Sequence, residues 1–229
     1  MYHMCDVTSI RIGKRMIATD PDFDEARTTM ELRLTYSGLL MGTGNKSRPS
    51  HVHDIRRKLN PQLRRFWRVN PWLSQYVTPW LDNYVPGSSQ HALGKLDKIM
   101  SNYSRCGYQF VPLVRKEDAL LCAVDVLFLR PGPVGSVLNK GDIDGRLATL
   151  FDALSVPAHC EQLGDHKVPG EGEDPFFCLL ADDSLVSQVS VETGELLEET
   201  EAGLDGNAAR IVMTVRLSPL VNLGYGRMA

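Results

Sequence analysis

Four aspartates in two short stretches are the residues of this chain best suited to chemistry. Asp142 and Asp144 lie in the sequence Gly-Asp-Ile-Asp-Gly, and Asp182 and Asp183 are adjacent. Carboxylates gathered in this way usually hold Mg²⁺ or Mn²⁺, because hard divalent cations prefer oxygen ligands. Such an ion can polarise a phosphoryl oxygen and turn water into a nucleophile near neutral pH. The two stretches therefore predict a divalent-metal site.

The first carboxylate pair should lie where an extended or turn segment enters a helix. Residues two apart do not share a face of a regular helix, and Gly141 and Gly145 permit the non-helical backbone that would let both aspartates reach one ion. Apolar residues then recur at helical spacing: Ile143, Leu147, Leu150, Phe151 and Leu154. The alternative is structural, because aspartate is a common cap at a helix start and paired aspartates are common in turns.

The segments around the aspartates indicate strands. Residues 120–129 form an apolar run that ends before Pro131-Gly132-Pro133, residues 185–191 give a second strand, and residues 210–217 alternate like a terminal one. Further strands are expected near 29–39 and 108–114. The sequence thus predicts an α+β fold with a mixed sheet flanked by helices.

This order of elements resembles the RusA family of Holliday junction resolvases, over residues 107–217. In that family a strand leads to Asp-x-Asp and a helix ending Phe-Asp-Ala-Leu, as at 151–154 here, and an Asp-Asp then opens a strand. The resemblance implies a homodimer that nicks four-way DNA junctions. It also implies that Asp142, Asp144 and Asp183 bind Mg²⁺ or Mn²⁺ and are catalytic.

Two positions depart from the family pattern. Gly145 stands where the family has Asn, and Ala148 stands where it has a catalytic lysine. A lysine at 148 would point to the same side of the helix as Asp144, and its loss removes a cation that could stabilise the transition state. Lys140, Arg146 or Lys167 could replace it. The alternative is a DNA-structure binding protein that kept the fold and lost turnover.

The distribution of charge points separately to a nucleic-acid partner. The chain has 25 Lys and Arg against 28 Asp and Glu, yet residues 46–68 hold eight basic residues and one acid. Lys and Arg that contact phosphates release counterions and supply sequence-independent affinity for DNA. Apolar residues recur there at helical spacing, with Asn60-Pro61 expected to end one helix and begin another. The predicted DNA-binding residues are Arg56, Arg57, Arg64, Arg65, Lys140 and Arg146.

Two regions beside these motifs have more than one interpretation. Residues 155–180, rich in Gly, Pro and charge, are typical of a surface loop, and without a Cys-x-x-Cys pair the His159, Cys160 and His166 group does not predict zinc. Six aromatic residues could stack on unpaired bases, but their spacing favours burial in the core. These are Phe66, Trp67, Trp72, Tyr76, Trp80 and Tyr84. Another helix is expected over 88–105.

The whole-chain properties set the remaining expectations. The length of 229 residues and the 43% hydrophobic content fit one elaborated globular domain over residues 1–229. No apolar run reaches the roughly 18 residues that cross a bilayer, and no signal peptide is evident, so a cytoplasmic location and no membrane partner are expected. Five scattered cysteines favour reduced thiols. The acidic segment 161–205 leaves open a third interpretation, an assembly protein with a basic partner.

Overall fold

The structure is a computed structural model that describes residues 9–13, 30–44, 48–77, 94–131, 143–197 and 206–219, with the backbone alone for 9–13. It is an α+β fold, as the sequence predicts, with two mixed sheets. Among the described residues, no helix combines the length and the apolar character needed to span a bilayer.

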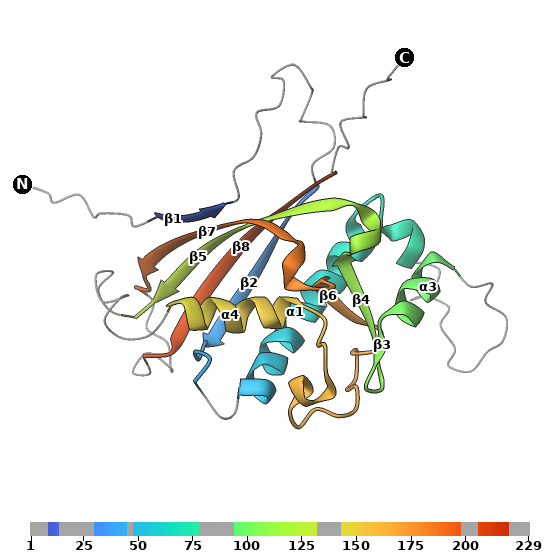
Figure 1. Cartoon of the computed structure of the whole chain (residues 1–229), viewed down its shortest axis with the longest axis horizontal. Helices are drawn as coiled ribbons and strands as arrows, with labels where there is room; N and C mark the ends of the chain where they lie inside the picture. The colour runs from blue at the N-terminus through green and yellow to red at the C-terminus, as the bar shows by residue number, and fades with distance from the viewer. Residues whose placement is uncertain are drawn as a thin grey trace, which may run out of the picture.

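A five-stranded sheet forms the larger part of the fold (Figure 1). Its spatial order is β1 (Ser9–Gly13), β7 (Val186–Glu195), β5 (Leu120–Arg130), β8 (Ala208–Pro219) and β2 (Met30–Leu39). Only β5 and β7 are parallel neighbours; the other pairs are antiparallel. Side chains along β5 alternate between buried and partly exposed, so that one face of the sheet is packed and the other is more open.

A smaller sheet consists of β3 (Ser104–Arg105), β4 (Tyr108–Val114) and β6 (Phe176–Leu180), with β4 and β6 parallel. The short helix η2 (Lys116–Asp118) joins β4 to β5, and η5 (Asp183–Leu185) joins β6 to β7. The chain therefore passes from the small sheet to the large one twice, along two parallel pairs. Between these passes it forms α4 (Ile143–Leu154) and the short helix η4 (Cys160–Leu163).

The long helix α1 (Arg48–Val69) connects the two sheets by packing against α4, β2 and β6, while α3 (Lys95–Asn102) packs on β4. One face of α1 is apolar and buried because its large side chains recur every three or four residues: Val52, Ile55, Leu59, Leu63 and Trp67. These side chains belong to the main core together with those of β2, β5 and β8.

Three sequence predictions about this framework are wrong. The helix does not break at Asn60-Pro61, since α1 runs through Pro61 as one helix. The segment 155–180 is not all surface loop, because it ends in β6, a strand whose five residues are all buried. The cysteines are not all reduced, because Cys106 and Cys160 form a disulfide.

Smaller differences concern the region after α1. Trp67 is buried as expected, but Trp72 is 73% exposed, so the aromatic residues do not form one core cluster. Trp80 and Tyr84 lie outside the described residues, as does the start of the helix expected over 88–105. Within the described part, that helix runs from Lys95 to Asn102.

Candidate nucleic-acid interface and carboxylate sites

The outer face of α1 carries a stripe of basic side chains. At 3.6 residues per turn, Arg57, Lys58, Arg64, Arg65 and Arg68 fall within about 120° of the helix circumference, opposite the buried apolar face. All are exposed or partly exposed. From residue 57 to residue 68 the stripe is about 16 Å long, which is enough to lie along several phosphates of a DNA strand. These five residues are called the basic stripe below.

Arg56 is not part of this surface. Its side chain is 2% exposed and donates to the carbonyl oxygens of Asp152, at 2.7 Å, and Ser155, at 3.0 Å. These carbonyls lie at the C-terminal end of α4, where the helix dipole is negative; the Asp152 oxygen also accepts from the Ser155 amide at 3.4 Å. Arg56 therefore stabilises the contact between α1 and α4. Its contact with DNA phosphates stays a prediction, and in this structure the guanidinium is buried against α4.

His53 extends the buried network of Arg56. One Arg56 guanidinium nitrogen lies 3.1 Å from His53 Nδ1, and the Tyr108 hydroxyl lies 3.4 Å from His53 Nε2. Because an arginine can only donate, His53 is assigned as neutral with its proton on Nε2. Burial, with the nearby Arg56 charge adding to it, lowers the pKa of His53 to about 3. The histidine is thus a neutral core residue.

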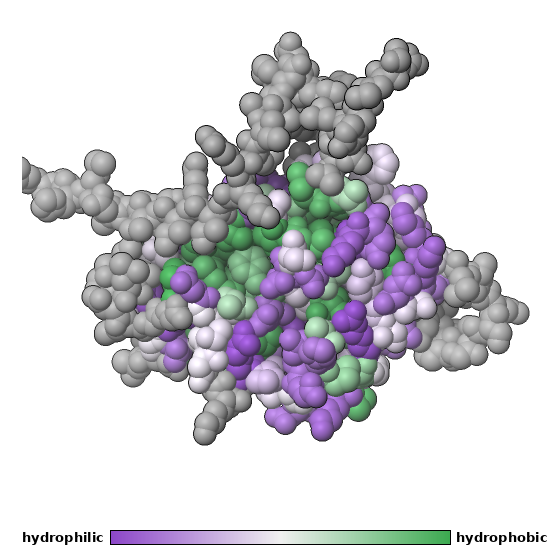
Figure 2. Space-filling view, in the orientation of Figure 1, coloured by the Kyte–Doolittle hydropathy of each residue, from purple (hydrophilic) through white to green (hydrophobic). Residues whose placement is uncertain are grey.

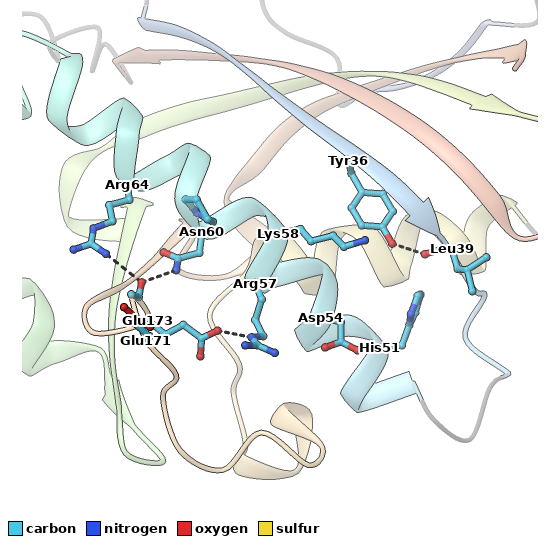
Figure 3. Close-up of a pocket in the computed structure, with 12 residues that line it drawn as sticks. Tyr36, Leu39, His51, Asp54, Arg57, Lys58, Asn60, Arg64, Glu171 and Glu173 are labelled. Carbon is cyan, nitrogen blue, oxygen red and sulfur yellow. Dashed lines mark hydrogen bonds and ion pairs between the residues drawn. The ribbon is translucent and has the colours of Figure 1, made fainter. Parts of the chain in front are cut away.

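Arg57 and Arg64 face a groove of about 630 Å³ between α1 and the segment 171–173 (Figure 3). Arg57 pairs with the buried Glu173 carboxylate, and this hydrogen bond raises the pKa of Arg57. Arg64 donates to the Gly172 carbonyl oxygen at 3.2 Å. Lys58, on the other side of the groove, donates to the Ser37 carbonyl oxygen and lies over the Tyr36 ring.

The predicted DNA contacts thus divide into distinct groups. Arg65 is exposed on the basic stripe, whereas Arg57 and Arg64 lie on it with protein partners. Arg146 is 4% exposed and donates to the Gly206 carbonyl and the Asn207 side chain, and its contact with DNA stays a prediction. Lys140 lies outside the described residues.

Of the first carboxylate pair, the structure describes Asp144, which is exposed in the first turn of α4. Asp142 lies outside the described residues. This end of α4 is close to the loop after β2 and the start of β8, since a Cβ on Gly42 would lie 4.0 Å from the Gly145 carbonyl carbon and Arg146 binds residues 206 and 207. Asp144 is thus held at one end of the large sheet.

Asp182 and Asp183 lie by the other end of α4. They line a cavity of about 250 Å³ together with Asp152, Arg48 and Arg56. Asp152 pairs with Arg48. The Asp182 side chain accepts hydrogen bonds from the Ser184 hydroxyl and, at 3.0 Å, from the Ser184 amide, and these bonds lower the pKa of Asp182. Asp183 is exposed, and its carboxylate has no hydrogen bond or ion pair with the described residues.

These positions do not fit one metal ion shared by Asp144 and Asp183. Asp152, which shares the cavity of Asp183, is eight residues beyond Asp144, or about 12 Å along the helix axis. Ligand oxygens must lie roughly 2.0 to 2.6 Å from an ion. Within the ranges that the structure describes, no three His, Cys, Asp or Glu side chains gather as metal ligands would.

Sequence reasoning missed two contacts that define these sites. The first is the cavity that Asp152 shares with Asp183. Asp152 belongs to the Phe-Asp-Ala-Leu segment, so the sequence offered it as a further carboxylate near the predicted site. The second is the ion pair between Arg57 and Glu173, which the sequence could not indicate because the two residues are 116 positions apart.

Comparison with known proteins gives no relative: no family model matches the chain, and neither the curated proteins nor the solved structures contain a match.

Proposed function

We propose that this protein binds branched DNA through the basic stripe of α1. The observation that carries the proposal is the separation of the two faces of this helix. One face is buried against α4, β2 and β6, and the other gathers five basic side chains with exposed surface. Phosphate contacts by Lys and Arg release condensed counterions, so a stripe of this kind supplies affinity for DNA without reading its sequence.

The preference for branched DNA comes from the likeness to RusA resolvases. The order of described elements supports it: β5 precedes the Asp-x-Asp segment, α4 begins within that segment and ends in Phe-Asp-Ala-Leu, and Asp182-Asp183 leads through η5 into β7. In this proposal the protein is a homodimer, since the resolvases it resembles use two copies on opposed strands of a junction.

Metal-dependent cleavage of the bound junction is the second candidate function. The observation that favours it is that Asp144 and Asp183 both keep exposed carboxylates, and that of Asp183 is unpaired within the described residues. Their separation along α4 means that one ion cannot be held by these two side chains as they stand. DNA binding is therefore the stronger candidate, and Mg²⁺ or Mn²⁺ chemistry belongs to the second.

One experiment separates these candidates. The purified protein is titrated into a labelled four-way junction and into a linear duplex of the same length, first with EDTA and then with Mg²⁺ or Mn²⁺. DNA binding predicts a complex in EDTA that prefers the junction. Nicks that appear with metal and disappear in Asp144→Asn and Asp183→Asn would establish cleavage. A protein that binds neither DNA at low salt contradicts the proposed function.

A further inference from the structure

The segment 158–173 lies along α1 and contacts it at successive turns. Ser50 donates to Asp165 at 3.0 Å, Asp54 pairs with His166 at 3.1 Å, and Arg57 pairs with Glu173. Asn60 and Arg64 both donate to the Gly172 carbonyl oxygen. Residues 50, 54, 57, 60 and 64 follow one side of the helix, because they are three or four apart. The segment is called the strap below.

The strap covers part of the basic stripe with negative charge. It contains four acids, Glu161, Asp165, Glu171 and Glu173, against Lys167. Glu173 and the Gly172 carbonyl occupy Arg57 and Arg64, the donors that a DNA phosphate would need, as Figure 3 shows. Lys58 and Arg65 remain on the open side. A carboxylate and a carbonyl oxygen of the strap therefore take the place that phosphate oxygens of DNA would take beside these two arginines.

A disulfide fastens the beginning of the strap. Cys160 of η4 is bonded to Cys106, which lies in the turn between β3 and β4. Cys160 is exposed and Cys106 partly exposed, and both line an open cavity of about 890 Å³. The surface around the strap is largely hydrophilic in the lower part of Figure 2, where the strap lies in Figure 1. A small dithiol can therefore approach this bond.

The closest contact between the strap and α1 depends on a glycine. Gly164 has a φ of +59°, and a Cβ at this position would lie 2.2 Å from the Ser50 hydroxyl oxygen. Any larger residue would strain the backbone and push the strap away from the start of α1. Two features thus hold the strap beside α1: the disulfide at residue 160 and the close approach at residue 164.

We propose that the strap is a disulfide-held cover that competes with DNA phosphates for Arg57 and Arg64. An external dithiol supplies two electrons and two protons, the Cys106–Cys160 bond breaks, two thiols form, and the dithiol becomes a disulfide. Without the bond, the contacts of the strap with α1 are polar and mostly at least partly exposed to solvent, apart from the ring contact of His166 with His53. Leu163 and the Tyr108 hydroxyl still hold the middle of the strap, but the effective concentration of its two ends beside the stripe falls. This inference rests on the proposed DNA binding and adds its regulation.

The test compares junction binding by the full chain before and after reduction with dithiothreitol. Reduction should tighten binding roughly tenfold at low salt and, because two more phosphates are contacted, steepen the plot of log affinity against log salt by about 1.8. Arg57→Gln should lose about half of that increase in slope. Gly164→Ala should bind more tightly than the unaltered protein while the disulfide remains intact. Hydrogen exchange of residues 165–173 should speed up on reduction without DNA.

The outcomes separate the inference from the proposed function. Measurable junction binding with the same affinity and slope in both redox states would overturn the cover and leave DNA binding intact. Unchanged hydrogen exchange of the strap on reduction would overturn it without reference to DNA. An absence of junction binding in either state, with faster exchange on reduction, would overturn the proposed function and the competition with phosphate.

Discussion

Arg56 and Arg57 are adjacent in sequence, but the turn of about 100° between them puts Arg56 on the buried side of α1 and Arg57 on the outer side. Arg56 is enclosed, and donates to two carbonyl oxygens at the end of α4 and to His53. Arg57 is 42% exposed and pairs with one carboxylate of the strap. The buried face uses its arginine to bind backbone carbonyl oxygens at the end of a helix, whereas the outer face keeps arginines where an anion can compete for them. A run of basic residues thus has two physical roles within one helix.

The largest expected effect concerns the bond that holds the cover over the outer face. The Cys106–Cys160 disulfide closes a loop of 54 residues, and removing such a cross-link costs about 4 kcal/mol in the chain-entropy model. Cys160→Ser should therefore lower the free energy of unfolding by up to this amount in urea titrations. Serine in place of the buried Cys122 would itself destabilise the core, so Cys122→Ser is a poor control. The stability of Cys160→Ser is instead compared with that of the unaltered protein in dithiothreitol. Equal stability of oxidised and reduced protein would contradict a structural role of the bond.

The next effect separates the two faces directly. Arg56→Ala removes the buried donor of the Asp152 and Ser155 carbonyl oxygens and leaves a cavity, and it should destabilise the fold by about 3 kcal/mol, while Arg65→Ala at the surface should cost less than about 0.5 kcal/mol. Chemical denaturation measures both. Equal losses of unfolding free energy in the two variants would contradict the claim that Arg56 supports the fold and Arg65 does not.

Asn60 lies at the boundary between the faces. Its side chain accepts from the Phe177 amide of β6 at 2.9 Å and donates to the Gly172 carbonyl of the strap at 3.3 Å. Asn60→Ala leaves a buried amide without an acceptor and should cost about 2 kcal/mol. Asn60→Asp keeps an acceptor for Phe177 but turns a buried carboxylate oxygen toward the Gly172 carbonyl oxygen, so it should destabilise the fold at least as much as Asn60→Ala. Denaturant titrations of the two variants decide this.

An effect of similar size is a pH dependence on the buried face. The pKa of His53 is about 3 in the fold against 6.5 in the unfolded chain, so the unfolded chain binds more protons between these values. The stability contributed by neutral His53 is complete above pH 6.5 and is lost as the pH falls toward 3. His53→Gln should show a shallower loss between pH 6.5 and 4.5 in urea titrations. An identical slope in both proteins would contradict burial of the neutral ring.

Much of the large sheet could be predicted because its signals are local. The apolar run of β5 and the alternation of β8 are visible within one strand, and α4 shows its helical spacing. The five apolar residues of β6 are too few to show a period, and they follow a charged segment typical of a loop. The break predicted at Pro61 is wrong because the tertiary packing of α1 outweighs the loss of the backbone hydrogen bond that proline cannot make.

The sites were harder to predict than the elements. The resemblance predicted that Asp144 and Asp183 share one site. Their positions depend on the direction of α4 and on β6, which ends beside the C-terminal end of α4, where the Val156 amide donates to the Leu180 carbonyl oxygen. Likewise, five cysteines at scattered positions do not reveal which two form a bond. The basic stripe was identified as a segment, and the structure shows which of its residues face outward.

The most direct test of DNA binding by the basic stripe compares two charge-matched double variants. Lys58→Gln with Arg65→Gln removes two cations from α1, and Lys95→Gln with Lys98→Gln removes two from α3, with one lysine over a tyrosine ring in each pair. We expect the α1 variant to bind the four-way junction more weakly and to reduce the salt slope by about 1.8. The α3 variant should keep the slope of the unaltered protein. Equal slopes for the two double variants would contradict the assignment of the DNA interface to α1.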